Sequence, residues 1–284
     1  MISNIEILYG LANRCINYGI KNSRSKSDLI PLDKILGVCD GVDGAEKYKW
    51  DPNDLSILKN YPGMSHFTKI DIKKNNLDQI IKIIQSHSQE NNSTYLKGFY
   101  IHNKVDENTI DIYKKYRELL KNRFDIKMGF SIYKQEEVNL IKENELILDI
   151  LQIPHNFNVE IDLSSLDINT CHVYLRSIFL QGAYFSNINN KFNKKTISRI
   201  TKQKSLLSNI ASSMGFELGQ YLFSEAVSYC KLKKYKGVVI GSSSINRLFS
   251  YVRNHKFIKT FEINRINNSD IIDDHLADPR KWKR

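Results

Sequence analysis

The sequence predicts an α/β protein of one domain, a (β/α)8 TIM barrel with eight parallel strands and a helix after nearly every strand. Two observations predict this fold. Short β-type runs alternate with helical patterns along nearly all of the 284 residues. Runs such as GVVIG and LILDIL are apolar without alternation, as parallel strands covered on both faces should be. Five prolines and no Gly/Ser-rich linker favour a single domain over 1–284, with a tail at about 260–284 packed on the barrel.

The first half of the chain contains four strand and helix units. Strands are expected at 5–12, 41–45, 66–70 and 96–102, and helices near 31–39, 53–60, 77–89 and 106–122. Asp51 or Asn53 is a candidate cap for the second of these helices, and Asp106 or a neighbour for the fourth.

The second half repeats the alternation less regularly. Strands are expected at 126–132, 146–154, 172–179 and 237–242, and helices at 134–144, 196–230 and 245–255. The short connection between the sixth and seventh strands predicts that one outer helix is short or missing. A doubly wound open sheet is the alternative, but no G-x-G-x-x-G follows the first strand.

Composition narrows the functional classes. The net charge of +11 is spread over predicted helix faces with acids interspersed, and no nucleic-acid motif accompanies it, which favours a solvated surface or attraction of an anionic ligand. Four cysteines lie far apart without metal-ligand spacing, so neither a zinc site nor a disulfide framework is expected. No signal peptide or membrane span is recognisable. We expect a cytoplasmic protein without a bound metal.

Four polar residues lie at or just after the ends of the second, third and fourth strands, where barrel active sites are found: Asp43, Tyr48, Lys69 and His102. Singly, each has an ordinary explanation as a turn residue, a half-buried ring, a surface cation or a core histidine. D-x-x-D-G around Asp40 and Asp43 also resembles part of a calcium loop, but too few oxygen ligands follow. Together the four make a chemically coherent set.

That set fits reduction of a carbonyl group. A tyrosine with a reference pKa of about 10 becomes a useful acid when a nearby ammonium favours its phenolate. A carboxylate keeps the lysine charged and fixed, and a histidine nitrogen can hydrogen-bond the carbonyl oxygen. No side chain can supply a hydride, so a cofactor must do so.

With these residues in place, the sequence resembles the aldo/keto reductases, NADP(H)-dependent (β/α)8 barrels with an Asp-Tyr-Lys-His tetrad. D-G-A-E-K-Y-K (43–49) matches the family's D-T-A-x-x-Y-G, Thr68-Lys69 its T-K, and His102 its histidine. A bacterial branch of the family is matched along nearly the whole chain by YGIKN, GFSIYKQEE, LQIPHN, RSIFLQG and DPRKW.

The resemblance also implies a cofactor site for NADP(H), with NAD(H) as the alternative. Ser131 and Gln152 should meet the nicotinamide carboxamide, and Ser177 and Phe179 the pyrophosphate. Arg176 stands where an aromatic residue often stacks on the nicotinamide. The loop after the last strand should hold the phosphates through Gly241, Ser242, Ser243 and Arg247, with Ser242 and Arg247 at the 2′-phosphate.

Two kinds of function remain open. The leading hypothesis is an NAD(P)H-dependent reductase of aldehydes or ketones, acting on a sugar or an anionic nucleotide sugar of surface-polysaccharide biosynthesis, as relatives in this branch suggest. Departures from the family at Gly44, Lys49 and Ile132 motivate an alternative, a nucleotide-binding barrel that serves as a sensor or partner with little turnover. The sequence does not indicate the oligomeric state.

Overall fold

The computed structural model describes residues 5–12, 29–46, 52–87, 95–159, 161–185, 192–257 and 276. Within them eight parallel strands form a closed barrel in chain order, as predicted. The strands are β1 (Glu6–Gly10), β2 (Gly41–Asp43), β3 (Ser65–Ile70), β4 (Leu96–Ile101), β5 (Lys127–Ser131), β6 (Ile150–Pro154), β7 (His172–Arg176) and β8 (Gly237–Ile240). β1 closes the barrel by pairing with β8 in the register Leu8↔Val239.

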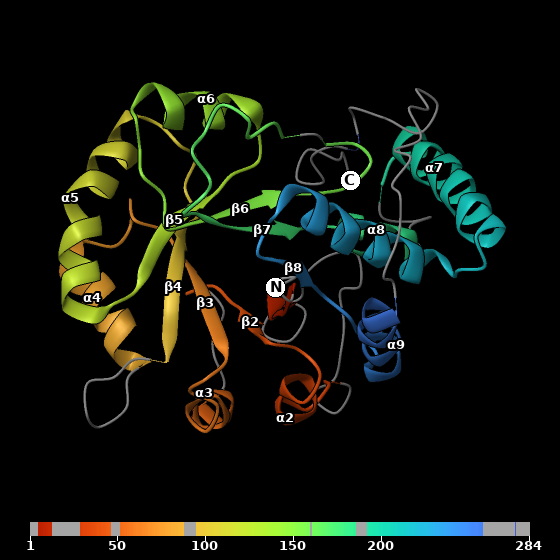
Figure 1. The fold of residues 1–284 in the computed structure, drawn as a ribbon, viewed down its shortest axis with the longest axis horizontal. Coiled ribbons are helices and arrows are strands. Elements are labelled where there is room, and N and C mark those ends of the chain that lie inside the picture. Colours follow the sequence, from red (N-terminus) through yellow and green to blue (C-terminus); the bar gives the residue numbers. More distant parts are fainter. Residues whose placement is uncertain are drawn as a thin grey trace.

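Helices surround the barrel (Figure 1). They are α2 (Leu32–Leu36), α3 (Pro52–Lys59), α4 (Leu77–Ser86), α5 (Glu107–Phe124), α6 (Gln135–Glu143), α7 (Lys194–Ser213), α8 (Leu218–Lys233) and α9 (Ile245–Phe257), with a short 3-10 segment, η2, at Leu180–Phe185. No helix lies between β6 and β7 in the described residues, which agrees with the short connection there. None of the described helices is long and apolar enough to span a membrane.

The local signals explain most of these boundaries. Asp106 caps α5 as predicted, because its Oδ1 accepts a hydrogen bond of 3.0 Å from the N–H of Thr109. Asn76 caps α4 in the same way through Gln79. The candidate cap Asp51 lies outside the described residues.

Three predicted elements differ clearly from the structure. The seventh strand, expected at 172–179, ends at Arg176, because Ser177 takes a left-handed φ of 60°. The helix expected over 196–230 is two helices, α7 and α8, because Gly215 takes a left-handed φ of +76° that ends the first one. The sixth strand begins at Ile150, not at residue 146. Asp149, just before it, accepts hydrogen bonds from the backbone N–H of Met128 (3.2 Å) and from Arg117 Nη2 (2.5 Å), and so belongs to a polar connection below the strand.

The barrel is filled by large side chains. One buried cluster takes a residue from each of six strands: Leu8, Phe67, Tyr100, Ile150, Tyr174 and Val239. The ring of Phe67 lies 5.7 Å from that of Tyr100 and 5.3 Å from that of Tyr174. A second, larger cluster fills the space between strands and helices and includes Leu276, which is fully buried. The first cluster lies directly below the residues at the carboxyl ends of the strands, and its three rings (Phe67, Tyr100 and Tyr174) form the aromatic floor of the barrel.

Candidate active site

The side-chain alternation of the strands selects one ring of residues at the mouth of the barrel. Side chains two positions apart on a strand point to the same face. Three of the predicted site residues are Lys69, Gln152 and Arg176. Each lies two positions after a member of the buried cluster inside the barrel, namely Phe67, Ile150 and Tyr174. His102 and Gly241 stand at the same offset from Tyr100 and Val239, directly after their strands. The pleat therefore brings residues that are far apart in sequence to one rim.

Asp43 and Lys69 form a buried ion pair at this rim. Lys69 Nζ donates a short hydrogen bond to Asp43 Oδ2, and both side chains are less than a tenth exposed. Backbone hydrogen bonds fix both residues, since the Asp43 carbonyl accepts from Leu11 N–H and the Lys69 carbonyl from Glu46 N–H, both at 2.9 Å. The pair thus has little freedom to move relative to the barrel.

Some groups around Lys69 raise its pKa, and others lower it. Burial lowers the pKa of the Lys69 ammonium, and the carboxylate of Asp43 raises it. The nearby guanidinium of Arg176 lowers this pKa further. The ring of Tyr100 lies below the ammonium, 5.6 Å from Nζ. Lys69 is therefore a desolvated cation whose charge depends on Asp43.

The other two members of the predicted tetrad are placed less fully. His102 is half-buried, and its backbone N–H donates a 2.9 Å hydrogen bond to the carbonyl of Ile70, which ties it to the end of β3. Tyr48 lies outside the described residues, as do Lys49 and the segments YGIKN and DPRKW. The tetrad is thus described at three positions on three adjacent strand ends.

Ser131, Gln152 and Arg176 form a second connected group at the ends of β5, β6 and β7. The Ser131 hydroxyl donates to Gln152 Oε1 (3.2 Å) and accepts from Arg176 Nε (3.3 Å). Gln152 Nε2 is fully buried, and no described residue accepts a hydrogen bond from it. This unused amide donor is suited to an acceptor oxygen of a ligand.

Arg176 is fixed from several sides. Its Nη2 donates to the carbonyl of Ile132 (2.8 Å), and its Nη1 donates to the Ser177 hydroxyl (3.1 Å). The ring of Tyr133 covers one face of the guanidinium, with its centroid 3.9 Å from Cζ. The resemblance implies an arginine where the family often has an aromatic residue, but the stack of this arginine on Tyr133 could not be read from the sequence.

The loop after β7 has a constrained backbone. Ser177, Leu180 and Gln181 have φ values of 60°, 47° and 53°, which non-glycine residues rarely adopt. Phe179 is buried, and its ring packs 5.3 Å from that of Tyr251. Its side chain therefore belongs to the packing between the loop and α9, and a contact to a pyrophosphate would come from this loop's backbone or from Ser177.

The loop after β8 is held by its serines. Ser242 Oγ donates to the Ser244 carbonyl (2.8 Å), and the Ser242 carbonyl accepts from the Tyr9 hydroxyl (2.7 Å). Arg247, in the first turn of α9, donates from Nη2 to Ser243 Oγ (2.8 Å). Gly241 and these residues lead directly into the N-terminus of α9, where backbone N–H groups favour an anion.

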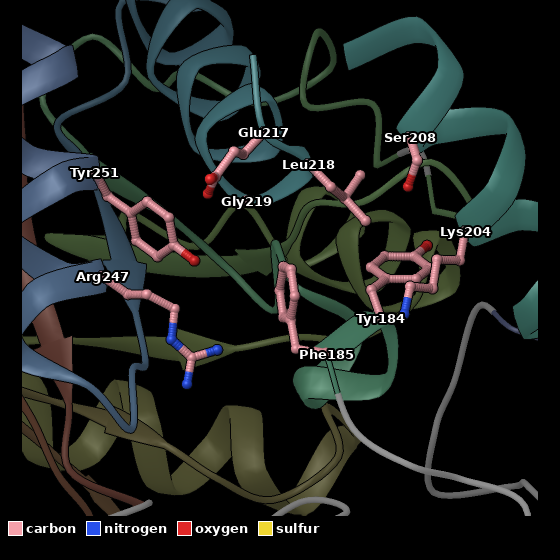
Figure 2. A pocket seen from close by; sticks show the side chains of 9 residues that line it. All are labelled: Tyr184, Phe185, Lys204, Ser208, Glu217, Leu218, Gly219, Arg247 and Tyr251. Atoms are coloured by element: carbon pink, nitrogen blue, oxygen red, sulfur yellow. The ribbon is translucent and has the colours of Figure 1, made fainter. Parts of the chain in front are cut away.

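A pocket of about 360 Å³ opens beside this loop, between η2, α7, α8 and α9. Figure 2 shows the Arg247 and Tyr251 side chains on one side of it, Lys204 on the other, and the ring of Phe185 between them. Its lining consists of Tyr184, Phe185, Lys204, Ser208, Glu217, Leu218, Gly219, Arg247 and Tyr251. The sequence predicted only Arg247 among these, because nothing in a lysine-rich helix distinguishes Lys204 from its neighbours.

The described residues contain no cluster of three or more His, Cys, Asp or Glu side chains suited to a metal ion. The described part of the rim carries a buried ammonium and carboxylate, a histidine, and polar groups that could hold an amide and phosphates.

Comparison with known proteins supports the fold. No protein-family model matches the sequence, and neither does any curated protein. Among solved structures, the holo form of an aldo-keto reductase from Bacillus halodurans is similar, with a TM-score of 0.63 and 13% identity over 96% of this chain and 92% of that chain. A glycerol dehydrogenase from Gluconobacter oxydans has a TM-score of 0.59 and 14% identity, covering 88% and 85%. An aldo-keto reductase from Klebsiella pneumoniae in complex with NADPH has a TM-score of 0.52 and 12% identity, also covering 88% and 85%. The fold of this chain is therefore that of the aldo-keto reductases, as the sequence resemblance predicted.

The buried ion pair leads to a prediction for Asp43→Asn. At pH 7 we expect the free energy of unfolding to fall by about 3–5 kcal/mol, because a buried ammonium loses its carboxylate. Loss of that carboxylate also lowers the pKa of Lys69 further below its unfolded value of about 10.4. Above the folded-state pKa the unfolded chain binds more protons, so stability rises with pH.

The free energy of unfolding of Asp43→Asn should therefore approach that of wild type as the pH is raised from about 7 towards 10, as measured by urea unfolding. Asp111→Asn, an exposed change on α5, is the control and should differ little from wild type at any pH. A deficit that stays constant or grows with pH would show that Asp43 does not stabilise the charged form of Lys69.

Proposed function

We propose that the protein is an NADPH-dependent oxidoreductase that reduces an aldehyde or ketone. The observation that carries this proposal is the buried Asp43–Lys69 pair at the carboxyl-end rim of a barrel with the aldo-keto reductase fold. Burying a charged lysine this deeply costs desolvation free energy, and such buried ionisable groups are typical of functional sites. The same rim carries the unused amide donor of Gln152, and a cation-lined pocket opens between η2, α7, α8 and α9. Both suit a large anionic cofactor.

The described residues fit a nicotinamide dinucleotide along this rim. Gln152 Nε2 and the Ser131 hydroxyl would hold the carboxamide, and Ser177 with the loop at Phe179 would meet the pyrophosphate. The loop from Gly241 through Ser242 and Ser243, at the N-terminus of α9, offers N–H groups to a phosphate.

The pocket beyond that loop suits the adenosine end. Lys204 and Arg247 would bind the 2′-phosphate that distinguishes NADP(H) from NAD(H), and Phe185 offers a ring for the adenine to stack on. When bound, the reduced nicotinamide supplies a hydride to the carbonyl carbon.

The side chains of the tetrad carry out the rest of the reaction. Lys69, kept charged by Asp43, lowers the pKa of the Tyr48 phenol. Tyr48 then donates its proton to the carbonyl oxygen as negative charge develops there. His102 hydrogen-bonds the same oxygen and fixes its orientation, so that the substrate is held in a reactive position.

The substrate class is a small carbonyl compound, and the charge of the chain favours an anionic one. A net charge of +11 attracts anions to a cleft, which fits a sugar derivative such as a nucleotide sugar. We place the protein in the cytoplasm, where its free buried cysteines would stay reduced.

The first prediction concerns the reaction itself. Tyr48→Phe and Lys69→Met should each slow NADPH oxidation in the presence of a panel of small aldehydes and aldoses by about 10²-fold or more, because each removes part of the acid catalyst. Tyr48→Phe leaves the ion pair intact, so its NADPH dissociation constant should stay within about threefold of wild type.

Lys97→Met, an exposed change on β4, is the matched control and should keep the wild-type rate. A wild-type rate in Tyr48→Phe would overturn the assignment of the acid. Binding of NADPH by wild type without turnover of any carbonyl in the panel would favour the sensor function.

The second prediction concerns the preference for NADPH. Arg247→Leu should weaken NADPH binding by about tenfold or more, since a charge-assisted hydrogen bond is worth about 1.5–3 kcal/mol. NADH binding should change by less than about twofold, because NADH lacks the 2′-phosphate. Titration of protein fluorescence measures both constants.

Arg253→Leu, an exposed change on the same helix, controls for the loss of positive charge on α9. Equal loss of affinity for NADPH and NADH in Arg247→Leu would show that Arg247 does not recognise the 2′-phosphate.

A further inference from the structure

Arg176 is a buried cation for which the proposed reaction has no use. Its side chain is 8% exposed, and its three hydrogen-bond acceptors are all uncharged: the Ser131 and Ser177 hydroxyls and the Ile132 carbonyl. No described residue places a carboxylate at ion-pair distance from it. Burying a guanidinium without a counter-charge is unfavourable, so a buried arginine at this position suggests a function for its charge.

Among the described residues, nothing cancels the charge of Arg176. The carboxylate that the described part of this rim contains is that of Asp43, and it is paired with Lys69, so the two neutralise each other. Tyr133 provides a ring face, which helps to retain the cation but carries no net charge. Because Arg176 is removed from water, its field is weakly screened and reaches its neighbours, including Lys69.

The position of Arg176 relative to the cofactor follows from Ser131. The Ser131 hydroxyl is hydrogen-bonded both to Arg176 Nε and to Gln152 Oε1. If Ser131 and Gln152 hold the carboxamide, a single residue, Ser131, connects the guanidinium to the nicotinamide through hydrogen bonds. The nicotinamide ring carries a positive charge when oxidised and none when reduced. A fixed cation beside it must repel the oxidised ring and leave the reduced ring nearly unaffected.

We propose that Arg176 makes the site discriminate between the redox states of the nicotinamide, so that the reduced dinucleotide binds more tightly than the oxidised one. This inference rests on the proposed function. The bound couple then has a higher reduction potential than the free couple, by about 30 mV for each tenfold ratio of the two dissociation constants. Weak binding of the oxidised form speeds its release after each turnover, at the expense of part of the driving force for hydride donation.

The test compares dissociation constants of NADPH and NADP⁺, measured by calorimetry at one pH and salt concentration. In wild type, NADPH should bind at least about tenfold more tightly than NADP⁺. Arg176→Gln keeps an amide donor but removes the charge, and it should reduce the ratio of the two constants by about tenfold. Arg176→Lys keeps the charge and should retain the ratio within about threefold.

Two further variants complete the design. Arg176→Met can still pack against Tyr133, and it provides a second neutral variant if Arg176→Gln does not fold. Arg123→Gln removes another arginine near an aromatic ring, that of Phe124 at 5.1 Å, on the exposed face of α5 far from the rim, and should leave the ratio unchanged.

The outcomes separate this inference from the function on which it rests. If wild type binds neither dinucleotide, the proposed function fails. If it binds both and NADP⁺ binds at least as tightly as NADPH, the role of Arg176 is overturned. The same holds if a folded neutral variant keeps the wild-type ratio, or if Arg176→Lys loses the ratio as fully as the neutral variants do.

Discussion

The buried ion pair between Asp43 and Lys69 is the interaction on which the site depends. Phe67 and Tyr100 exclude water beneath it, and this desolvation would neutralise the lysine if the carboxylate were absent. The same desolvation strengthens the field of the ammonium, so that in the proposed reaction it would act strongly on the Tyr48 phenol. In the proposed reaction Phe67 and Tyr100, the carboxylate and the lysine would act together: burial strengthens the field of the ammonium, and Asp43 keeps the lysine charged.

Closure of the barrel gives this unit its neighbours. β3, β6 and β7 each contribute a residue two positions after their member of the interior cluster. Lys69, Gln152 and Arg176 therefore share a rim, although more than a hundred residues separate the first from the last. Two cations with opposite consequences result. Lys69 is compensated by Asp43, and in the proposed reaction it would act on a proton. Arg176 has no described carboxylate, and in our proposal it would act on the charge that changes beside Ser131.

Much of this arrangement could be predicted from the sequence. The alternation of apolar runs and helical patterns predicts eight strands, and the position of Lys69 at the end of its strand predicts a rim residue. Four features could not be predicted. Gly215 breaks a helical pattern that continues on both sides of it, and Asp149 shortens a strand because partners distant in sequence hold it. The stack of Tyr133 on Arg176 and the place of Lys204 in the pocket depend on tertiary packing between elements, which periodicity does not encode. Tyr48 lies outside the described residues, so its place beside Lys69 remains a prediction.

The most direct measurement of the central claim is the pKa of the Tyr48 phenol, read from tyrosinate ultraviolet absorbance as the wild-type titration minus that of Tyr48→Phe. The chain has 15 tyrosines, but burial raises the pKa of Tyr100, Tyr113 and Tyr174, so these ionise later and do not obscure the difference. We expect one phenol that ionises well below the reference value of about 10, and we expect its pKa to return to that value in Lys69→Met. If the wild-type and Tyr48→Phe curves coincide below pH 10, or if the early ionisation survives in Lys69→Met, the lysine does not activate the tyrosine and the central claim is wrong.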